Sequence, residues 1–377
     1  MLTNQAIPFI SAVDYVLEDP ELWIRRVSRS WGDRVPHLER ESNGTDTWVI
    51  DGRRVPLSKL ADLGALVADR AETTQRWDEI PEAAYTPGAR LEAMDRGGID
   101  YSVLYPSLAG FSGENLAGIT DPELEIACVQ AYNDWLIDEW SRSSDRFIPQ
   151  ALVPLSSTDA TVREIKRAVG RGHKGIVFPA VPMHIRNASH INGPEYDPIW
   201  GACQHLDVPI CFHAGSSRQL HYPSASNYSS ELAAALEAVI RPASAVFDLV
   251  NLLFSRILLR FPRLNVVFAE SSIGWGTFLL EYADHQYEQD HCDYELKPSE
   301  MFRRQCYLTA WYERVKNDPG CIAPANMMWA TNFPLANSSW PESSAFIKNC
   351  LSELEENQRE EILWGNAAKL YKISKPL

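Results

Sequence analysis

The sequence lacks an excess of positive charge, a long apolar run and a basic N-terminal segment. Its formal net charge of −15 at pH 7 argues against nucleic acid or an anionic membrane surface as its partner. Residues 1–6 contain no basic segment that leads into an apolar run, so we expect no signal peptide and a cytoplasmic location. The most apolar later stretch, residues 245–259, contains Asp248 and Arg256, which predicts a core helix rather than a membrane span.

Paired cysteines and the common catalytic motifs are also missing. The seven cysteines are an odd number without a Cys-x-x-Cys pair, which is typical of scattered reduced thiols. The chain has no Gly-x-Ser-x-Gly elbow, no Walker loop, no dinucleotide fingerprint after a strand and no His-Glu-x-x-His. Ser216 and Ser217 lie beside His213, with Cys211 just before it, but adjacency in sequence does not build a catalytic triad.

What the sequence does contain is a regular alternation of short apolar runs and helical stretches. The runs lie at residues 8–13, 99–105, 147–153, 175–178, 208–212, 264–269, 305–309 and 327–330. Eight strands separated by helices predict an α/β fold, a (β/α)8 TIM barrel with right-handed crossovers. Such barrels often reach 377 residues as one domain with insertions. We therefore expect a single domain over residues 1–377.

Two segments fall outside this alternation. Residues 24–88 contain two short strands around the Asp51-Gly52 turn, which predicts an insertion after the first strand that covers the barrel mouth or forms a subunit contact. Residues 342–371 contain two helical patterns and form a C-terminal helical extension.

Several polar residues follow the apolar runs directly. In a parallel barrel the carboxyl ends of the strands carry the chemistry, so His213 and Glu270 are the leading catalytic candidates. A buried carboxylate at Glu270 needs a partner, and an ion pair with a nearby Arg or Lys is the structural alternative. Glu18 follows the first strand, although acidic residues in loops are mostly solvated. His184 and His190 follow the fourth strand, and His184 is a substrate-binding candidate if its loop turns inward.

Residues 328–341 pass from an apolar run through Thr331 into a loop with two prolines. This segment, which ends in Trp340-Pro341, resembles the last-strand motif of the amidohydrolase-2 family, the relatives of aminocarboxymuconate-semialdehyde decarboxylase. Further matches are Val16, Glu18, Pro20, Leu22 and Trp23; Phe212-His213-Ala214-Gly215; Phe268-Ala269-Glu270-Ser271 with Gly274-Trp275; and Gly365-Asn366-Ala367. The resemblance covers essentially the whole chain.

The resemblance implies a metal site at the barrel mouth. The family takes two ligands from the first strand, one each from the fifth and sixth strands, and an Asp from the last strand. His213 matches the fifth-strand ligand and Glu270 a sixth-strand ligand or neighbouring group. The resemblance thus implies a residual site for one divalent zinc, manganese or iron ion.

The other family ligands are replaced in this chain. Val13 and Tyr15 stand at the two first-strand positions, and neither a valine nor a neutral phenol is a good ligand for a divalent ion. Asn332 replaces the last-strand Asp, and Leu335 replaces the following His. Hydrolytic and decarboxylating metal sites need at least three good ligands, so the sequence predicts a degenerate site unless Glu18, His184 or His190 completes a different ligand set. Tyr15 and Asn332 then become substrate-binding candidates.

Three functions fit these observations. The first is a structural or regulatory subunit that pairs with a metal-competent paralogue as a heterodimer or heterotetramer, as in an aminoisobutyrate hydroxylase-type enzyme, or that forms a homodimer. The second is an active decarboxylase or hydrolase of a small carboxylate that uses His213 and Glu270 with or without one metal. The third is a barrel that binds a small ligand without turning it over.

Overall fold

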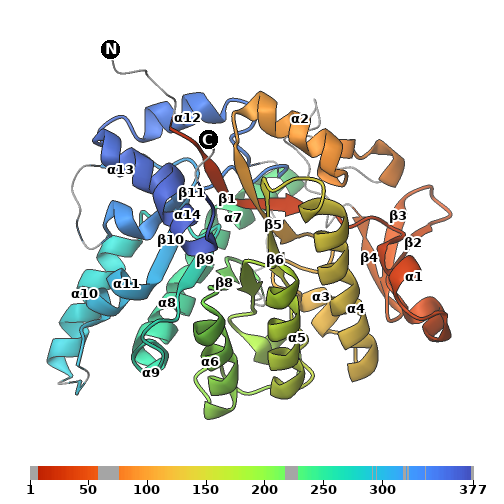
Figure 1. Ribbon diagram of the computed structural model, residues 1–377, viewed down its shortest axis with the longest axis horizontal. Coiled ribbons are helices and arrows are strands. Elements are labelled where there is room, and N and C mark those ends of the chain that lie inside the picture. Colours follow the sequence, from red (N-terminus) through yellow and green to blue (C-terminus); the bar gives the residue numbers. More distant parts are fainter. Residues whose placement is uncertain are drawn as a thin grey trace.

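The structure, a computed structural model, describes residues 7–57, 76–216, 228–290, 292–293, 295–316, 320, 322–335 and 337–374. Eight parallel strands stand at its centre and helices surround them (Figure 1). The strands are β1 (Ile10–Val16), β5 (Tyr101–Pro106), β6 (Phe147–Ala151), β7 (Gly175–Val177), β8 (Ile210–His213), β9 (Val266–Ala269), β10 (Cys306–Ala310) and β11 (Met327–Trp329). They pair in this order, which confirms the predicted barrel.

Backbone hydrogen bonds between β1 and the residues after β11 close the barrel. The Tyr15 N–H donates to the Phe333 carbonyl at 2.7 Å, and the Asn332 N–H donates to the Val13 carbonyl at 3.0 Å. The Asp14 carboxylate reinforces this seam, because it accepts from Ser102 Oγ at 2.6 Å and from the Phe333 N–H at 3.0 Å. The last strand end is therefore held against the first.

The helices of the barrel lie between its strands. They are α2 (Pro87–Gly97), α3 (Glu114–Ala117), α4 (Pro122–Trp135), α5 (Thr158–Arg171), α6 (Asp197–Leu206), α7 (Ser230–Ile240), α8 (Ser244–Phe254), α9 (Ile257–Arg260), α10 (Gly276–Gln289) and α11 (Pro298–Gln305). Local capping fixes several starts: the Ser157 hydroxyl accepts from the Ala160 N–H at the start of α5. The C-terminal extension comprises α12 (Ser343–Cys350), α13 (Glu356–Glu360), the π-helical turn η10 (Glu361–Gly365) and α14 (Asn366–Tyr371).

Three predicted elements need correction. The first strand reaches Val16 rather than Val13, because Tyr15 and Val16 pair with β5. The expected single helix over residues 245–259 is two helices, since Arg256 between them adopts a left-handed conformation at φ 62°. The amphipathic pattern of residues 121–142 predicts one long helix, but the structure has a regular helix only to Trp135, followed by a π-helical turn, η5 (Leu136–Ser141).

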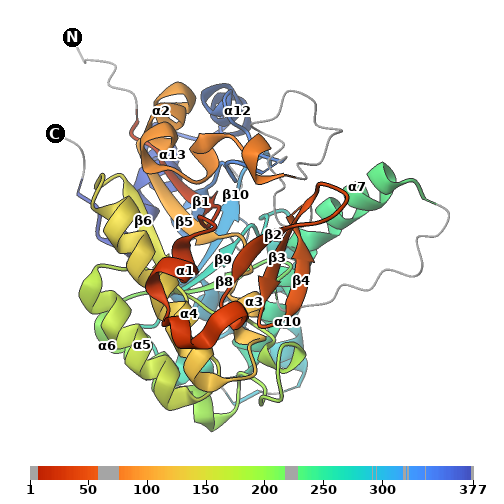
Figure 2. The same ribbon diagram turned by 90° about the vertical axis from the view of Figure 1, so that its right-hand side faces the viewer.

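The insertion after the first strand forms a separate antiparallel sheet (Figures 1 and 2). Its strands are β2 (His37–Arg40), β3 (Asp46–Ile50) and β4 (Arg53–Pro56), next to helix α1 (Leu22–Arg26). The sequence predicted β3 and β4 around their turn but missed β2. Trp48 packs edge-on against Trp23 and Trp77 at ring distances of 5.9 and 6.3 Å, which attaches the sheet to the core. Its covering or subunit-contact role stays a prediction.

No helix in the described ranges is long and apolar enough to cross a membrane. The six cysteines described by the structure, at positions 128, 203, 211, 292, 306 and 350, are free. Cys321 lies outside the described residues.

Candidate functional site

The barrel brings four predicted site residues to the carboxyl end of its strands. Tyr15 lies on β1, His213 ends β8, Glu270 follows β9 and Asn332 follows β11. Their exposed fractions are 0%, 1%, 2% and 0%. Polar groups buried this completely need hydrogen-bond partners within the protein, and those partners define what the site can do.

The central contact is a hydrogen bond between Tyr15 and His213. Nδ1 of His213 lies 2.8 Å from the Ala214 carbonyl oxygen and can only donate to it, so Nδ1 carries the ring proton. Nε2 is then an acceptor, and the Tyr15 hydroxyl donates to it at 2.7 Å. The tyrosine thus occupies the lone pair with which this histidine would bind a metal.

Glu270 joins the same cluster. Its Oε2 lies 3.3 Å from the Tyr15 hydroxyl and 3.7 Å from His213 Nε2. The Asn337 side-chain amide donates to Oε1 at 2.8 Å, and the Arg241 guanidinium lies 4.0 Å from Oε2. The ion-pair alternative for Glu270 therefore has a partner in Arg241, although the contact is long and the shorter bond comes from an uncharged amide.

Burial favours the uncharged form of each group in the Tyr15–His213–Glu270 cluster. It lowers the pKa of His213 to about 3 and raises the pKa of Glu270, with nearby Arg241 opposing the rise at Glu270. It also raises the pKa of the Tyr15 hydroxyl well above its ordinary value. The imidazole is therefore neutral at pH 7, and Glu270 holds its proton to a higher pH than an exposed glutamate.

Two of the site residues have an unusual backbone conformation. Glu270 and Asn332 lie in the left-handed region at φ 51° and 54°, which costs a residue with a side chain about 1–3 kcal/mol. Oδ1 and Nδ2 of Asn332 have no hydrogen-bond partner among the residues that the structure describes. A buried amide without a partner costs free energy, so Asn332 is a natural attachment point for a water molecule or a ligand.

An aromatic ring and a guanidinium cover the cluster. Phe111 stacks on the His213 ring, with centroids 4.6 Å apart and planes at 20°. The Arg241 guanidinium lies 5.9 Å from the Phe111 centroid. Gly215, at φ 79°, allows this arrangement, since a Cβ there would fall 2.5 Å from Arg241 Cγ.

Glu18 corrects the expectation of a solvated loop carboxylate. It is fully buried, and its two oxygens accept from the Leu108 and Ala109 N–H groups at 2.7 and 3.0 Å. Burial raises its pKa to about 7 against the effect of these hydrogen bonds. Glu18 therefore anchors the loop after β5.

The histidines of the fourth-strand loop lie in and beyond the short turn η6 (Pro182–His184). His184 and His190 are both exposed, and the substrate-binding role of His184 stays a prediction.

Sequence reasoning missed Asp14. Besides Ser102 and Phe333, its carboxylate accepts from Ser11 Oγ at 2.9 Å and from the Thr331 hydroxyl. A charged residue inside an apolar strand was the available signal, because such a residue must find partners.

The residues next to His213 in the sequence are not arranged for nucleophilic catalysis. The Ser216 hydroxyl donates to the His213 backbone carbonyl at 2.8 Å, so this bond does not activate it through the imidazole. Burial raises the pKa of Cys211 to about 12, which keeps its thiol protonated at pH 7. Ser217 lies outside the described residues.

The donor set does not suit a resident divalent metal. Within the described ranges there is no group of three or more His, Cys, Asp or Glu side chains that could hold an ion. Tyr15 occupies His213 Nε2, and an amide stands at Asn332 where the family has a carboxylate. Metal binding here would first have to break the tyrosine–histidine bond.

Comparison with known proteins places this arrangement in context. Residues 75–373 match the family Amidohydro_2, described as amidohydrolase. A gamma-resorcylate decarboxylase from Rhizobium radiobacter is 30% identical over 127 residues, which are 33% of this chain and 37% of that protein. The chain thus spans well under half of this relative's length.

Solved structures share the fold over a larger part of the chain. An amidohydrolase from Mycobacterium avium subsp. paratuberculosis K-10 has a TM-score of 0.72 at 18% identity and covers 97% of this chain and 99% of its own. A dihydroxybenzoic acid decarboxylase from Polaromonas sp. JS666 has a TM-score of 0.61 at 19% identity, over 85% of this chain and 94% of its own. That protein has bound manganese and the inhibitor 2-nitroresorcinol.

Proposed function

This chain belongs to the Amidohydro_2 family of amidohydrolases, and on that premise we propose that it is a barrel subunit without the family's metal chemistry. It pairs with a metal-competent paralogue in a hetero-oligomeric enzyme. The enzyme is a hydrolase, decarboxylase or hydroxylase of a small carboxylate or amino acid. The supporting observation is the 2.7 Å bond from the Tyr15 hydroxyl to His213 Nε2.

Tyr15 stands at a position where the family has a metal ligand, and its hydroxyl also occupies the nitrogen of His213 that a metal would bind. An ion at His213 would need the Nε2 lone pair that the Tyr15 hydroxyl already engages. It would also leave that hydroxyl buried beside Glu270, whose other oxygen already accepts from Asn337. Losing this buried hydrogen bond costs about 0.5–1.5 kcal/mol before any metal ligand is gained, and the hydroxyl keeps only its longer 3.3 Å bond to Glu270 Oε2.

The first test is metal content per subunit, measured on the purified chain alone and in complex with the paralogue. We expect close to no metal on the chain alone and metal assigned to the paralogue in the complex. One tightly held ion per isolated chain would overturn the proposal.

Restoring the lost ligands provides a matched pair of variants. Tyr15→His with Asn332→Asp should raise the metal content of the folded chain, because it frees His213 and adds two ligands. Tyr15→Phe with Asn332→Asp frees the same nitrogen but adds only the carboxylate, so it should gain less. Equal metal content in both double variants would show that the strand ends are assigned wrongly.

A second candidate function is a metal-independent decarboxylase. It is favoured by the strained backbone at Glu270 and Asn332 and by the unpartnered Asn332 amide, since strain and unsatisfied groups gather at functional sites. The similarity to gamma-resorcylate decarboxylase points the same way. In this mechanism the carboxyl group of Glu270 donates its proton to the substrate carbon that bears the carboxylate. The C–C bond then breaks, its electron pair returns to the carbon skeleton, CO2 leaves, and water returns a proton to Glu270.

The Glu270→Gln variant separates the two functions, because it keeps the size of the side chain but has no acidic proton. In the assembled complex, a non-catalytic chain predicts that turnover changes less than about threefold, with assembly intact. The decarboxylase mechanism predicts a loss of about two decades or more, the usual size of a general-acid contribution. Ser272→Ala serves as a control at the same strand end, where the Ser272 hydroxyl contacts Glu313 instead.

A further inference from the structure

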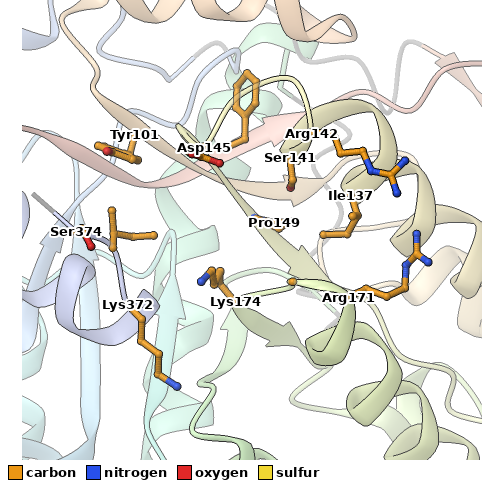
Figure 3. A pocket seen from close by; sticks show the side chains of 13 residues that line it. Tyr101, Ile137, Ser141, Arg142, Asp145, Pro149, Arg171, Lys174, Lys372 and Ser374 are labelled. Atoms are coloured by element: carbon orange, nitrogen blue, oxygen red, sulfur yellow. The ribbon is translucent and has the colours of Figure 1, made fainter. Parts of the chain in front are cut away.

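A cavity lies at the end of the barrel opposite the Tyr15–His213–Glu270 cluster, where the strands begin (Figure 3). Its volume is about 670 Å³, within the range that holds small organic molecules. Its walls come from the amino ends of β5 and β6, the residue before β7, the η5 turn and the residues after α14. Catalytic residues in these barrels come from the other face, so this cavity is independent of the proposed function.

The lining of this amino-terminal cavity is basic although the whole chain is acidic. Arg142, Arg171, Lys174 and Lys372 contribute to it, and Asp145 is the one acidic side chain that the described part of the chain adds to the lining. Arg171 is bonded to Asp134 and Asp138, and Lys372 to Asp207, so carboxylates outside the lining engage these two cations.

The pairing of Arg142 is weaker. Among the described residues it forms an ion pair only with Asp138, at 3.3 Å. Asp138 also pairs with Arg26 and with Arg171, each at 3.0 Å. Arg26 also pairs with Glu139 and Arg171 with Asp134, whereas the one ion pair of Arg142 among the described residues is this longer contact with Asp138.

Two polar groups of the lining have no partner among the residues that the structure describes. Lys174 is half-buried, and its ammonium group has no carboxylate within 4.0 Å in the part of the chain that the structure describes. Ser141 Oγ is buried and forms no hydrogen bond with any described residue. In the view of Figure 3, Pro149 lies between Ser141 and Lys174 on the cavity wall.

The backbone places Ser141 at the end of the π-helical turn η5, which is the segment that the sequence pattern predicted as regular helix. Such turns are rare and gather at functional sites. Ile137, from the same turn, and Pro149 are buried and give the cavity an apolar wall beside its two free donors.

We propose that this amino-terminal cavity binds a small organic anion. Its single carboxylate, phosphate or sulfonate head accepts hydrogen bonds from Lys174 and Ser141, with Arg142 adding positive charge. Its apolar body lies against Ile137 and Pro149. Asp145 is exposed on the rim and carries a negative charge, which disfavours ligands with a second anionic group and selects those with one charged end.

The test is calorimetric titration of the full chain with two probes, 4-bromobenzoate and phenyl phosphate. We expect binding at one site per chain, and a loss of at least about tenfold in affinity for Lys174→Met, since a hydrogen bond to a charged group contributes about 1.5–3 kcal/mol. Ser141→Ala should weaken binding by about threefold to tenfold. Lys166→Met removes the same charge from an exposed position on α5 outside the cavity and should stay within about twofold of the unmodified chain.

The position of the probe gives an independent readout. Anomalous density for the bromine of 4-bromobenzoate should lie beside Ile137 and Pro149. Preference for one probe identifies the head group and supports the proposal in either case. The proposal is overturned if neither probe binds at about 10 mM, if Lys174→Met and Lys166→Met bind equally, or if the bromine lies at the barrel mouth.

Discussion

The two ends of this barrel treat their polar groups in opposite ways. At the carboxyl end, Tyr15, His213 and Glu270 are almost completely buried and bond mainly to one another and to nearby amides. At the amino end, Ser141 and Lys174 line an open cavity without partners in the described part of the chain. Except at Asn332, whose amide has no partner among the described residues, the mouth therefore contributes to the stability of the fold, whereas the amino-terminal cavity keeps donors available for a ligand.

This difference in pairing affects the stability of the folded chain. Groups that bond one another recover most of the free energy lost on leaving water, whereas an unpartnered buried hydroxyl does not. Substitutions at the carboxyl end should accordingly lower the free energy of unfolding strongly, and substitutions at the amino end should change it little.

The largest effect is expected at the Asp14 seam. Asp14→Ala should lower the free energy of unfolding by about 3–5 kcal/mol, because it leaves the Ser11, Ser102 and Thr331 hydroxyls and the Phe333 N–H without their acceptor. Urea unfolding measures this difference. Asp33→Ala, at an exposed position, should stay within about 0.5 kcal/mol. Equal effects of the two variants would mean that the seam does not hold the barrel closed.

Tyr15→Phe should have the next largest effect. It keeps the ring but removes the hydroxyl, which leaves His213 Nε2 without its donor, and should cost about 1–3 kcal/mol. Tyr312→Phe makes the same chemical change at an exposed tyrosine and should be nearly neutral. If Tyr15→Phe stabilises the chain instead, the Tyr15–His213–Glu270 cluster is maintained for function at the expense of stability.

A smaller, pH-dependent effect is expected at Glu18. Its folded pKa of about 7 lies above the ordinary value of 4.5, so the folded chain binds its proton more tightly than the unfolded chain. This contribution to stability is complete below pH 4.5 and is lost as the pH rises to 7. Glu18→Gln does not titrate, so the stability of the unmodified chain relative to this variant should fall across that window.

His213 also contributes to the pH dependence of stability, with the opposite sign. Its pKa of about 3 makes the chain less stable as the pH falls below the ordinary value of 6.5, which is the opposite trend. His213 is present in both chains, so subtracting their unfolding free energies at each pH cancels it. A difference that does not vary between pH 4.5 and 7 would show that Glu18 ionises normally.

The smallest effect is expected at the amino end. Ser141→Ala removes a buried hydroxyl without a described partner and should change the free energy of unfolding by less than about 0.5 kcal/mol, or stabilise slightly. Thermal and urea unfolding both measure this. A loss above about 1 kcal/mol would show that the hydroxyl is paired in solution and would remove the contrast between the two ends.

The carboxyl-end residues were predicted from the sequence because their positions follow from local patterns. Apolar runs that stop at His213 and just before Glu270 mark strand ends, and parallel strands in a barrel bring their carboxyl ends to one face. The contacts between the side chains could not be predicted in this way. Tyr15 and His213 are 198 residues apart, and no local pattern specifies that one hydroxyl will bond the other's Nε2.

The surroundings of Glu18 and Ser141 could not be predicted from local sequence patterns either. A glutamate in a loop is expected to be solvated, but the loop after β5 covers Glu18 and supplies two N–H donors. Ser141 reads as part of a regular helix, yet the helix widens into a π-helical turn before it ends. The Glu18 outcome depends on a loop that lies about 90 residues further along the chain.

The sequence by itself determined the alternation of strands and helices and the strand ends that meet at the mouth. These follow from periodicity and from residue type, which are local properties. The tertiary structure decided that Tyr15 engages His213, that Asp14 fastens the seam, and that the amino end keeps a cavity with free donors. Those features are hydrogen bonds and spaces between distant segments, and they exist only once the barrel has closed.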